Sequence, residues 1–118
     1  MATIILLGME TDLATPLARI LREHGHNVKL TKSVEKVLFE RNVDIVFAGG
    51  DGPDYREIVE RLTGRRPGLR VVLVNRLPEN ARWLDALELG AADYCGAPFE
   101  PVQMRWLVDS VLRHPVAA

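Results

Sequence analysis

The 118-residue chain has one cysteine, few aromatic residues and almost no net charge. The lone Cys95 excludes an internal disulfide and is typical of a reducing compartment, so we expect a cytoplasmic protein. Fifteen Lys and Arg against sixteen Asp and Glu give a formal charge of −1, which argues against direct binding of nucleic acid. No apolar run approaches the roughly 20 residues that cross a bilayer, and no basic segment leads into one at the N-terminus. We therefore expect neither a membrane span nor a signal peptide.

What the chain does contain is typical of a folded domain. Its hydrophobic fraction of 47% and charged fraction of 26% exclude an intrinsically disordered chain. The length suits one domain, because single domains cluster around roughly 100–150 residues. We expect a single domain over residues 1–118.

Short apolar runs alternate with segments of helical period. The runs predict strands, the last weaker than the others, at Thr3–Leu7, Asn27–Leu30, Asp44–Ala48, Arg70–Val74 and Ala92–Cys95. Unbroken apolar character suits strands that are covered on both faces, as in a parallel sheet. Five strand–helix repeats therefore predict a doubly wound α/β fold with a five-stranded parallel sheet and helices on both faces.

Local signals predict where the intervening helices begin. Pro16 inside the first helical pattern favours Thr15 as N-cap, with Pro16 at the first helical position. Ser33 and Asp54 are candidate N-caps of the next two helices, and Pro101 opens the last. In such a fold ligands bind beyond the carboxyl ends of the strands, so the loops that follow the strands are the candidate site.

Three stretches of the chain resemble response-regulator receiver domains. They are Gly25–Val28, Asp44–Phe47 with Pro53, and Leu87–Tyr94 continuing through Pro98-Phe99. The last is the most specific, because a strand that ends in Tyr-x-x-Lys-Pro-Phe is nearly a signature of that family. The resemblance spans nearly the whole chain and implies a flavodoxin-like sheet in strand order 2-1-3-4-5.

The same resemblance implies where the chemistry of a receiver should lie. A working receiver binds Mg²⁺ through an acidic pair, accepts phosphate on an Asp, and holds the phosphoryl group with a Thr or Ser and a Lys. Those positions are occupied here by other residues, namely Gly8 and Met9 for the pair, Gly49 for the acceptor, Asn75 for the Thr and Ala97 for the Lys. We therefore expect an atypical pseudo-receiver that is not an enzyme, needs no cofactor and acts by protein–protein interaction in signal transduction.

Three carboxylates near these positions leave an alternative open. Asp51, with Glu10 or Asp12, could form a divergent phosphorelay site, which would then require Mg²⁺. The simpler interpretation is that Asp51 bonds its own backbone in a Gly-rich turn, while Glu10 and Asp12 face a helix dipole.

The Gly-rich turn also suggests a small-molecule or nucleotide-binding domain. Gly49, Gly50 and Gly52 can expose backbone N–H groups to an anion. However, no Gly-Lys-Ser/Thr follows, and the loop after residue 7 lacks the second and third glycines of a dinucleotide fingerprint. This function remains an alternative.

Two tryptophans suggest an interaction surface. In the register of the resemblance Leu84 and Leu87 point inward, which turns Trp83 outward, and Trp106 lies beside the apolar stripe of the last helix. We expect a face formed by the fourth helix, fifth strand and fifth helix to bind a protein partner or effector domain, or a second copy of the chain. Its predicted anchors are Arg82, Trp83, Tyr94 and Trp106. The competing interpretation is that each ring lies flat on its own helix and binds nothing.

The remaining chemistry-bearing residues have simpler interpretations. His24 and His26 are two positions apart, do not share a helical face, and are expected to be surface histidines. Cys95 is expected to be a small buried residue. Arg61, Arg65, Arg66 and Arg70 form one basic cluster, interpreted as a solvated helix end with an acidic partner as the alternative.

Overall fold

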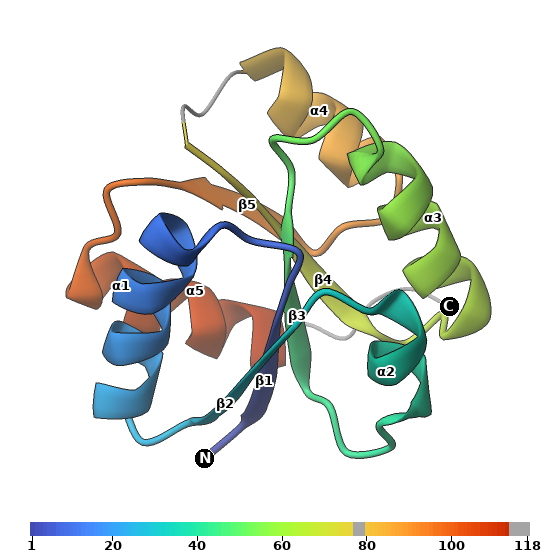
Figure 1. Cartoon of the computed structure of the whole chain (residues 1–118). Helices are drawn as coiled ribbons and strands as arrows, with labels where there is room; N and C mark the ends of the chain where they lie inside the picture. The colour runs from blue at the N-terminus through green and yellow to red at the C-terminus, as the bar shows by residue number, and fades with distance from the viewer. Residues whose placement is uncertain (77–79, 114–118) are drawn as a thin grey trace.

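The computed structural model describes residues 1–76 and 80–113, with side chains excepted at 80–83 (Figure 1). Strands and helices alternate along the chain. The strands are β1 (Thr3–Leu7), β2 (Asn27–Thr31), β3 (Ile45–Gly49), β4 (Arg70–Asn75) and β5 (Asp93–Gly96). The helices are α1 (Thr11–Glu23), α2 (Val34–Phe39), α3 (Tyr55–Arg65), α4 (Asn80–Glu88) and α5 (Pro101–Arg113).

All five strands are parallel and lie in the order β2-β1-β3-β4-β5, which confirms the predicted fold. Helices α1 and α5 cover one face of the sheet, and α2, α3 and α4 cover the other (Figure 1). No helix in the described ranges is long and apolar enough to cross a membrane.

The sheet separates two hydrophobic cores. In the central strand β3, Ile45 and Phe47 belong to the core beneath α1 and α5, while Val46 and Ala48 belong to the core beneath α2, α3 and α4. Alternate residues of a strand point to opposite faces, so an unbroken apolar strand supplies both cores. This is why β3 carries no polar residue along its length.

Helix α1 begins earlier than its proline suggests. The sequence favoured a start at Pro16, but the helix begins at Thr11 and Pro16 lies inside it. The Glu10 carbonyl accepts the amides of Leu13 and Ala14 at 3.0 and 2.9 Å. Both of these side chains are buried, at 5% and 2% exposure, and their burial stabilises the additional turn.

The predicted N-cap positions of α2 and α3 are confirmed, but only one of the two side chains makes the capping bond. The Ser33 hydroxyl accepts the Lys36 amide at 3.2 Å and caps α2. Asp54 is the N-cap residue of α3, but its side chain makes no capping bond. Its ψ of 11° lies outside the extended region that brings an N-cap side chain over the first free amides.

The predicted inward face of α4 is wrong. Leu84 and Leu87 are 59% and 41% exposed, whereas Ala86 is fully buried and Leu89 packs against the core. Asp85 accepts the Tyr55 hydroxyl at 2.5 Å and also pairs with Arg56, both on α3. These contacts hold α4 against α3, so that Ala86 faces the sheet and the two leucines turn outward.

His26 is not a free surface histidine. Its Nδ1 accepts the backbone N–H of Ala2 at 3.0 Å, at the amino end of the sheet. Partial burial lowers the pKa of His26 below its usual range, with a further contribution from the nearby N-terminal charge. The histidine therefore joins the start of β1 to the start of β2 in its neutral form.

Candidate functional site

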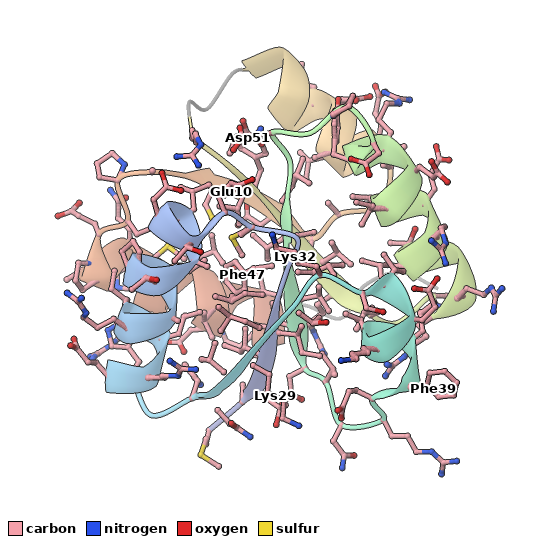
Figure 2. All side chains as sticks on the ribbon, viewed as in Figure 1. Glu10, Lys29, Lys32, Phe39, Phe47 and Asp51 are labelled. Carbon is pink, nitrogen blue, oxygen red and sulfur yellow. The ribbon has the colours of Figure 1, made fainter. Side chains whose placement is uncertain are left out.

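The segments that follow β1, β3 and β5, and Arg76 directly after β4, lie at the carboxyl end of the sheet, as the fold class predicts (Figure 2). This end brings together the positions that the resemblance assigns to receiver chemistry. Met9 is only 8% exposed and packs into the α1–α5 core, so it contributes no polar ligand. Gly8 has a φ of +67°, a conformation that side chains rarely adopt.

Gly49 is the most constrained of these positions. A Cβ added there would lie 2.7 Å from the Gly8 carbonyl oxygen and 3.5 Å from Met9 Cγ. A Cβ on Gly50 would lie 2.7 Å from both Asn75 Oδ1 and Leu73 Cγ. The backbone after β1 thus fills the space that a side chain at residue 49 would require.

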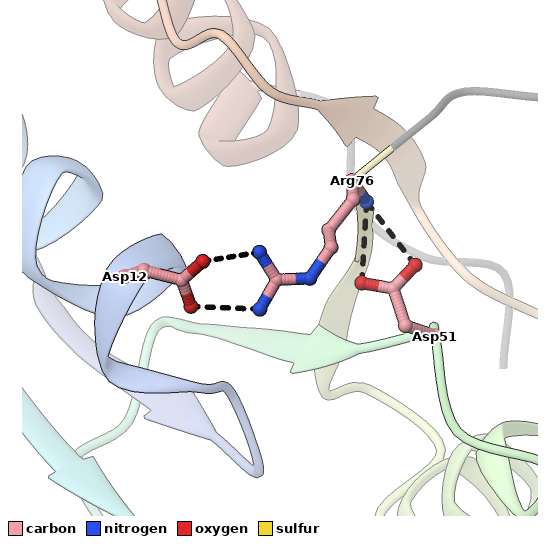
Figure 3. Close-up of polar contacts among 3 residues, drawn as sticks. All are labelled: Asp12, Asp51 and Arg76. Atoms are coloured by element: carbon pink, nitrogen blue, oxygen red, sulfur yellow. Dashed lines mark hydrogen bonds and ion pairs between the residues drawn. The ribbon is translucent and has the colours of Figure 1, made fainter.

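Asp51 bonds to the end of β4. Its carboxylate accepts Asn75 Nδ2 at 3.1 Å. It also accepts the Arg76 amide at 3.1 and 3.2 Å (Figure 3). Asn75 itself is 1% exposed, and its Oδ1 is buried without a hydrogen-bond partner among the described residues. The structure therefore supports neither a turn in which Asp51 bonds its own backbone nor a pairing of Asp51 with Glu10.

Arg76 is the residue that sequence reasoning missed. Its guanidinium forms a two-point ion pair with Asp12 in the first turn of α1, with one bond at 2.7 Å (Figure 3). This hydrogen bond holds the pKa of Asp12 below its usual range and raises that of Arg76. The available signal was an arginine placed directly after a strand, at the sheet edge where three carboxylates gather.

The three candidate carboxylates do not form one site. Asp12 and Asp51 lie on either side of Arg76, while Glu10 is exposed and its carboxylate makes no bond with the described residues. Within the described ranges no group of three or more His, Cys, Asp or Glu side chains could hold a metal ion. The Arg76 guanidinium pairs with Asp12 and would repel a cation placed between Asp12 and Asp51. The residues present therefore do not fit a magnesium site.

Two further residues at the carboxyl end of the sheet, Ala97 and Gly50, also bond within the chain. Ala97 precedes a cis proline, donates its amide to the Asn75 carbonyl at 3.1 Å and packs against the α1–α5 core. The Gly50 amide donates to the Val74 carbonyl at 2.8 Å, so it does not face an anion. The Asp51 carboxylate next to it would repel one.

The face formed by α4, β5 and α5 carries exposed apolar side chains. Trp106 is 72% exposed, as predicted, and Val102 on the same helix is 62% exposed. Tyr94 is half-buried against the core beneath α2, α3 and α4. Arg82 and Trp83, the other two predicted anchors, lie outside the described side chains.

Beside this face lies a cavity of about 340 Å³ between β5 and the start of α5. Cys95 is among its lining residues, but burial raises the pKa of the thiol to about 12. The thiol is therefore protonated at neutral pH, in keeping with the predicted role of a small apolar residue.

The fold of the chain is similar to that of known protein structures. No protein-family model matches the chain. A response-regulator receiver domain protein from Clostridium thermocellum superposes with a TM-score of 0.82 at 16% identity, over 96% of this chain and 95% of that one. The chain has the receiver-domain fold.

Two further structures with the receiver fold are similar. The BeF3-activated DrrB receiver domain has a TM-score of 0.79 at 26% identity, over 97% of this chain and 99% of that one. NtrX from Brucella abortus, solved with ADP, has a TM-score of 0.85 at 21% identity, over 95% of this chain. The match covers only 26% of NtrX, so there the receiver fold is one part of a longer protein.

Proposed function

We propose that this chain is a signal-transduction module of pseudo-receiver type, which acts by protein–protein contact and is not phosphorylated on Asp. One observation carries the proposal: the acceptor position is Gly49, and the Gly8 carbonyl occupies the space that an acceptor side chain would fill. A residue without a side chain supplies no nucleophile for phosphoryl transfer.

The surrounding residues support the same conclusion. Phosphoryl transfer needs a cation and donors aimed at the phosphoryl oxygens. Ala97 supplies no ammonium group, and the Arg76 guanidinium is paired with Asp12. We therefore propose a protein that is not an enzyme and requires no cofactor.

The proposed contact surface is the face formed by α4, β5 and α5. Large exposed apolar side chains stand on two of its elements, namely Leu84 and Leu87 on α4 and Val102 and Trp106 on α5. Surfaces that bind proteins are enriched in such aromatic and aliphatic anchors. The partner is a second protein, an effector domain or another copy of the chain.

The test is an amide NMR fingerprint of the chain, titrated with Mg²⁺ and then with beryllofluoride. Beryllofluoride mimics a phosphoryl group on a carboxylate, so a competent receiver must show saturable shifts. We expect none around Asp51, Asn75 and Tyr94, with the DrrB receiver domain as the positive control. Saturable shifts that Asp51→Asn abolishes would overturn the proposal in favour of a divergent phosphorelay site.

The same sample tests the nucleotide alternative. ADP and ATP should leave the amides of residues 49–52 unshifted, because the Asp51 carboxylate repels phosphate groups. Saturable shifts in this segment, accompanied by a ligand-dependent rise in melting temperature, would favour a nucleotide-binding domain instead.

A further inference from the structure

A groove lies between α2 and the carboxyl-terminal half of α3. It encloses about 330 Å³ and is lined by Glu35, Leu38, Phe39, Arg61 and Arg65. This volume lies at the lower end of the range for ligand pockets, and it suits one or two large side chains. In Figure 2, Phe39 stands at the opposite end of the molecule from Asp51. The groove is therefore separate from the carboxyl-end loops.

The apolar part of the groove is an uncovered aromatic ring. Phe39 is 85% exposed, although the neighbouring residues Val34 and Val37 of the same helix are buried. Leu38 packs partly against the core and forms the adjoining apolar wall. Because Phe39 adds almost nothing to the core, its apolar surface remains available to a partner.

Two carboxylates on or directly after α2, Glu35 and Glu40, have cation partners. Glu35 accepts Arg61 Nη2 at 2.7 Å, and this bond lowers the pKa of the Glu35 carboxyl. Glu40 lies 3.6 Å from Lys29 Nζ. Neither carboxylate neutralises the other arginines around the groove.

Three arginines near the groove have no carboxylate partner among the described residues. Arg65 lines the groove, and Arg41 lies two residues beyond the end of α2. Both are exposed, and their guanidinium groups make no bond with the described residues. Arg66 donates to the carbonyl oxygens of Glu40 at 2.5 Å and Arg41 at 3.4 Å, which are uncharged acceptors. The rim of the groove therefore has a local excess of positive charge on a chain whose formal net charge is −1.

We propose that this α2–α3 groove binds an acidic peptide segment of a partner protein. An apolar side chain of the peptide packs against Phe39 and Leu38, and its carboxylates pair with Arg65 and Arg41. Arginine suits this role because its planar guanidinium binds a carboxylate at two points. The proposal does not depend on the pseudo-receiver function, since it uses none of the residues at the carboxyl-end loops.

The observations favour a peptide over a nucleic acid. The groove has a single exposed ring, whereas single-stranded nucleic acids are bound by successive aromatic platforms along a basic channel. A short acidic peptide segment with one large apolar side chain matches both the volume and the charge of the groove.

The test uses two ten-residue peptides, titrated into the isotopically labelled full chain and followed by amide NMR. Both contain Leu-Trp-Leu, flanked in one by Asp and Glu and in the other by Lys and Arg. The acidic peptide should give saturable shifts confined to residues 35–41 and 61–66. The basic peptide should give none there. Absence of saturable shifts with the acidic peptide, or equal shifts with both, would overturn the proposal.

Four variants locate the binding site. Phe39→Ser and Arg65→Glu should each weaken the acidic peptide about tenfold or more. Arg105→Glu on α5 and Leu30→Ser on β2 make the same kinds of change at exposed positions away from the groove and should leave the affinity within about twofold. Unchanged amide shifts outside the groove show that each variant is folded. Equal weakening by these two control variants would place the peptide on another surface and reject the groove.

Two further outcomes separate the other possible occupants. A twelve-nucleotide single-stranded DNA that displaces the acidic peptide and binds more tightly would reject a peptide site in favour of nucleic acid. Amide shifts at the groove that depend on protein concentration, without peptide, would assign the groove to a second copy of the chain. Under the proposal neither effect is observed.

Discussion

Phe47 and Phe39 lie in two regions that the fold treats in opposite ways. Phe47, in the central strand β3, is fully buried in the α1–α5 core, and β3 ends at the tightly packed carboxyl-end loops. Phe39, the last residue of α2, is 85% exposed beside a groove with an excess of arginine charge. One ring is buried in the core, and the other exposes apolar surface that the described residues leave uncovered.

The same contrast distinguishes the two kinds of candidate site. At the carboxyl end, side chains and backbone bond to one another, as Asp51 does with Asn75 and Arg76, and little remains free for a ligand. On the outer helix surfaces, large apolar residues remain uncovered. This difference favours function through surface contact over chemistry in an enclosed site.

The largest expected change in stability comes from truncating the buried ring of Phe47. Phe47→Ala should lower the free energy of unfolding by about 3–5 kcal/mol, because it leaves a cavity in a packed core. Phe39→Ala is the matched control and should change it by less than about 0.5 kcal/mol. Urea denaturation followed by circular dichroism measures both. Similar losses for the two variants would mean that Phe39 has a structural role which its exposure does not indicate.

A Cβ at residue 49 tests how closely the carboxyl-end loops pack. Gly49→Ala should destabilise the chain by about 2 kcal/mol, since the Gly8 carbonyl must move away from the new methyl group. Gly64→Ala is the control, because no atom lies within 4 Å of its Cβ position in α3. That variant should be neutral or stabilise by up to about 1 kcal/mol. A Gly49→Ala protein as stable as the wild type would show that this end has room for an acceptor side chain.

Asp51→Ala should have a smaller effect. The change removes the acceptor for Asn75 Nδ2 and the Arg76 amide, and it leaves a buried amide group unpaired. We expect a loss of about 1–2 kcal/mol in the free energy of unfolding. Asp109→Ala, at an exposed position of α5, should change it by less than about 0.5 kcal/mol. Equal values for the two variants would argue that the Asp51 bonds contribute nothing.

The smallest effect concerns the exposed ion pair between Asp12 and Arg76. Arg76→Gln should raise the pKa of Asp12 toward its ordinary value of 3.8, because the hydrogen bond from Arg76 is the main cause of its depression. A carboxylate with a depressed native pKa stabilises the fold above about pH 3.8, and this contribution is lost as the pH falls through the native pKa.

The measurement is an NMR titration of the Asp12 carboxyl carbon between pH 2 and 6. High salt should produce a similar rise in the wild type, because an exposed pair is screened. Arg105→Gln should leave the Asp12 pKa unchanged. An Asp12 pKa that does not respond to Arg76→Gln would show that the pair is not formed in solution.

Several features could be predicted because they depend on neighbouring residues in the sequence. The β-branched apolar runs predicted five strands, and the observed bounds differ from the predicted ones by a residue or so at an end. Ser33 caps α2 because its partner amide is only three positions away. The parallel order also follows from the strand–helix alternation, together with the resemblance to receivers.

Other features were mispredicted because packing overrides local preference. Burial of Leu13 and Ala14 starts α1 ahead of its proline. The contacts of Asp85 with α3 set which face of α4 turns toward the sheet. Neither the early start of α1 nor the orientation of α4 can be read from the sequence of that helix alone.

By itself, the sequence determined the fold class, the loops at which a site would lie and the absence of side chains at Gly8 and Gly49. Only the tertiary structure decided how those loops are filled. Arg76 reaches Asp12 across 64 positions and Asp51 reaches Asn75 across 24, and the Gly8 carbonyl faces Gly49. These contacts exist because a parallel sheet brings the carboxyl ends of distant strands to one edge, and side-chain geometry then selects which charges pair.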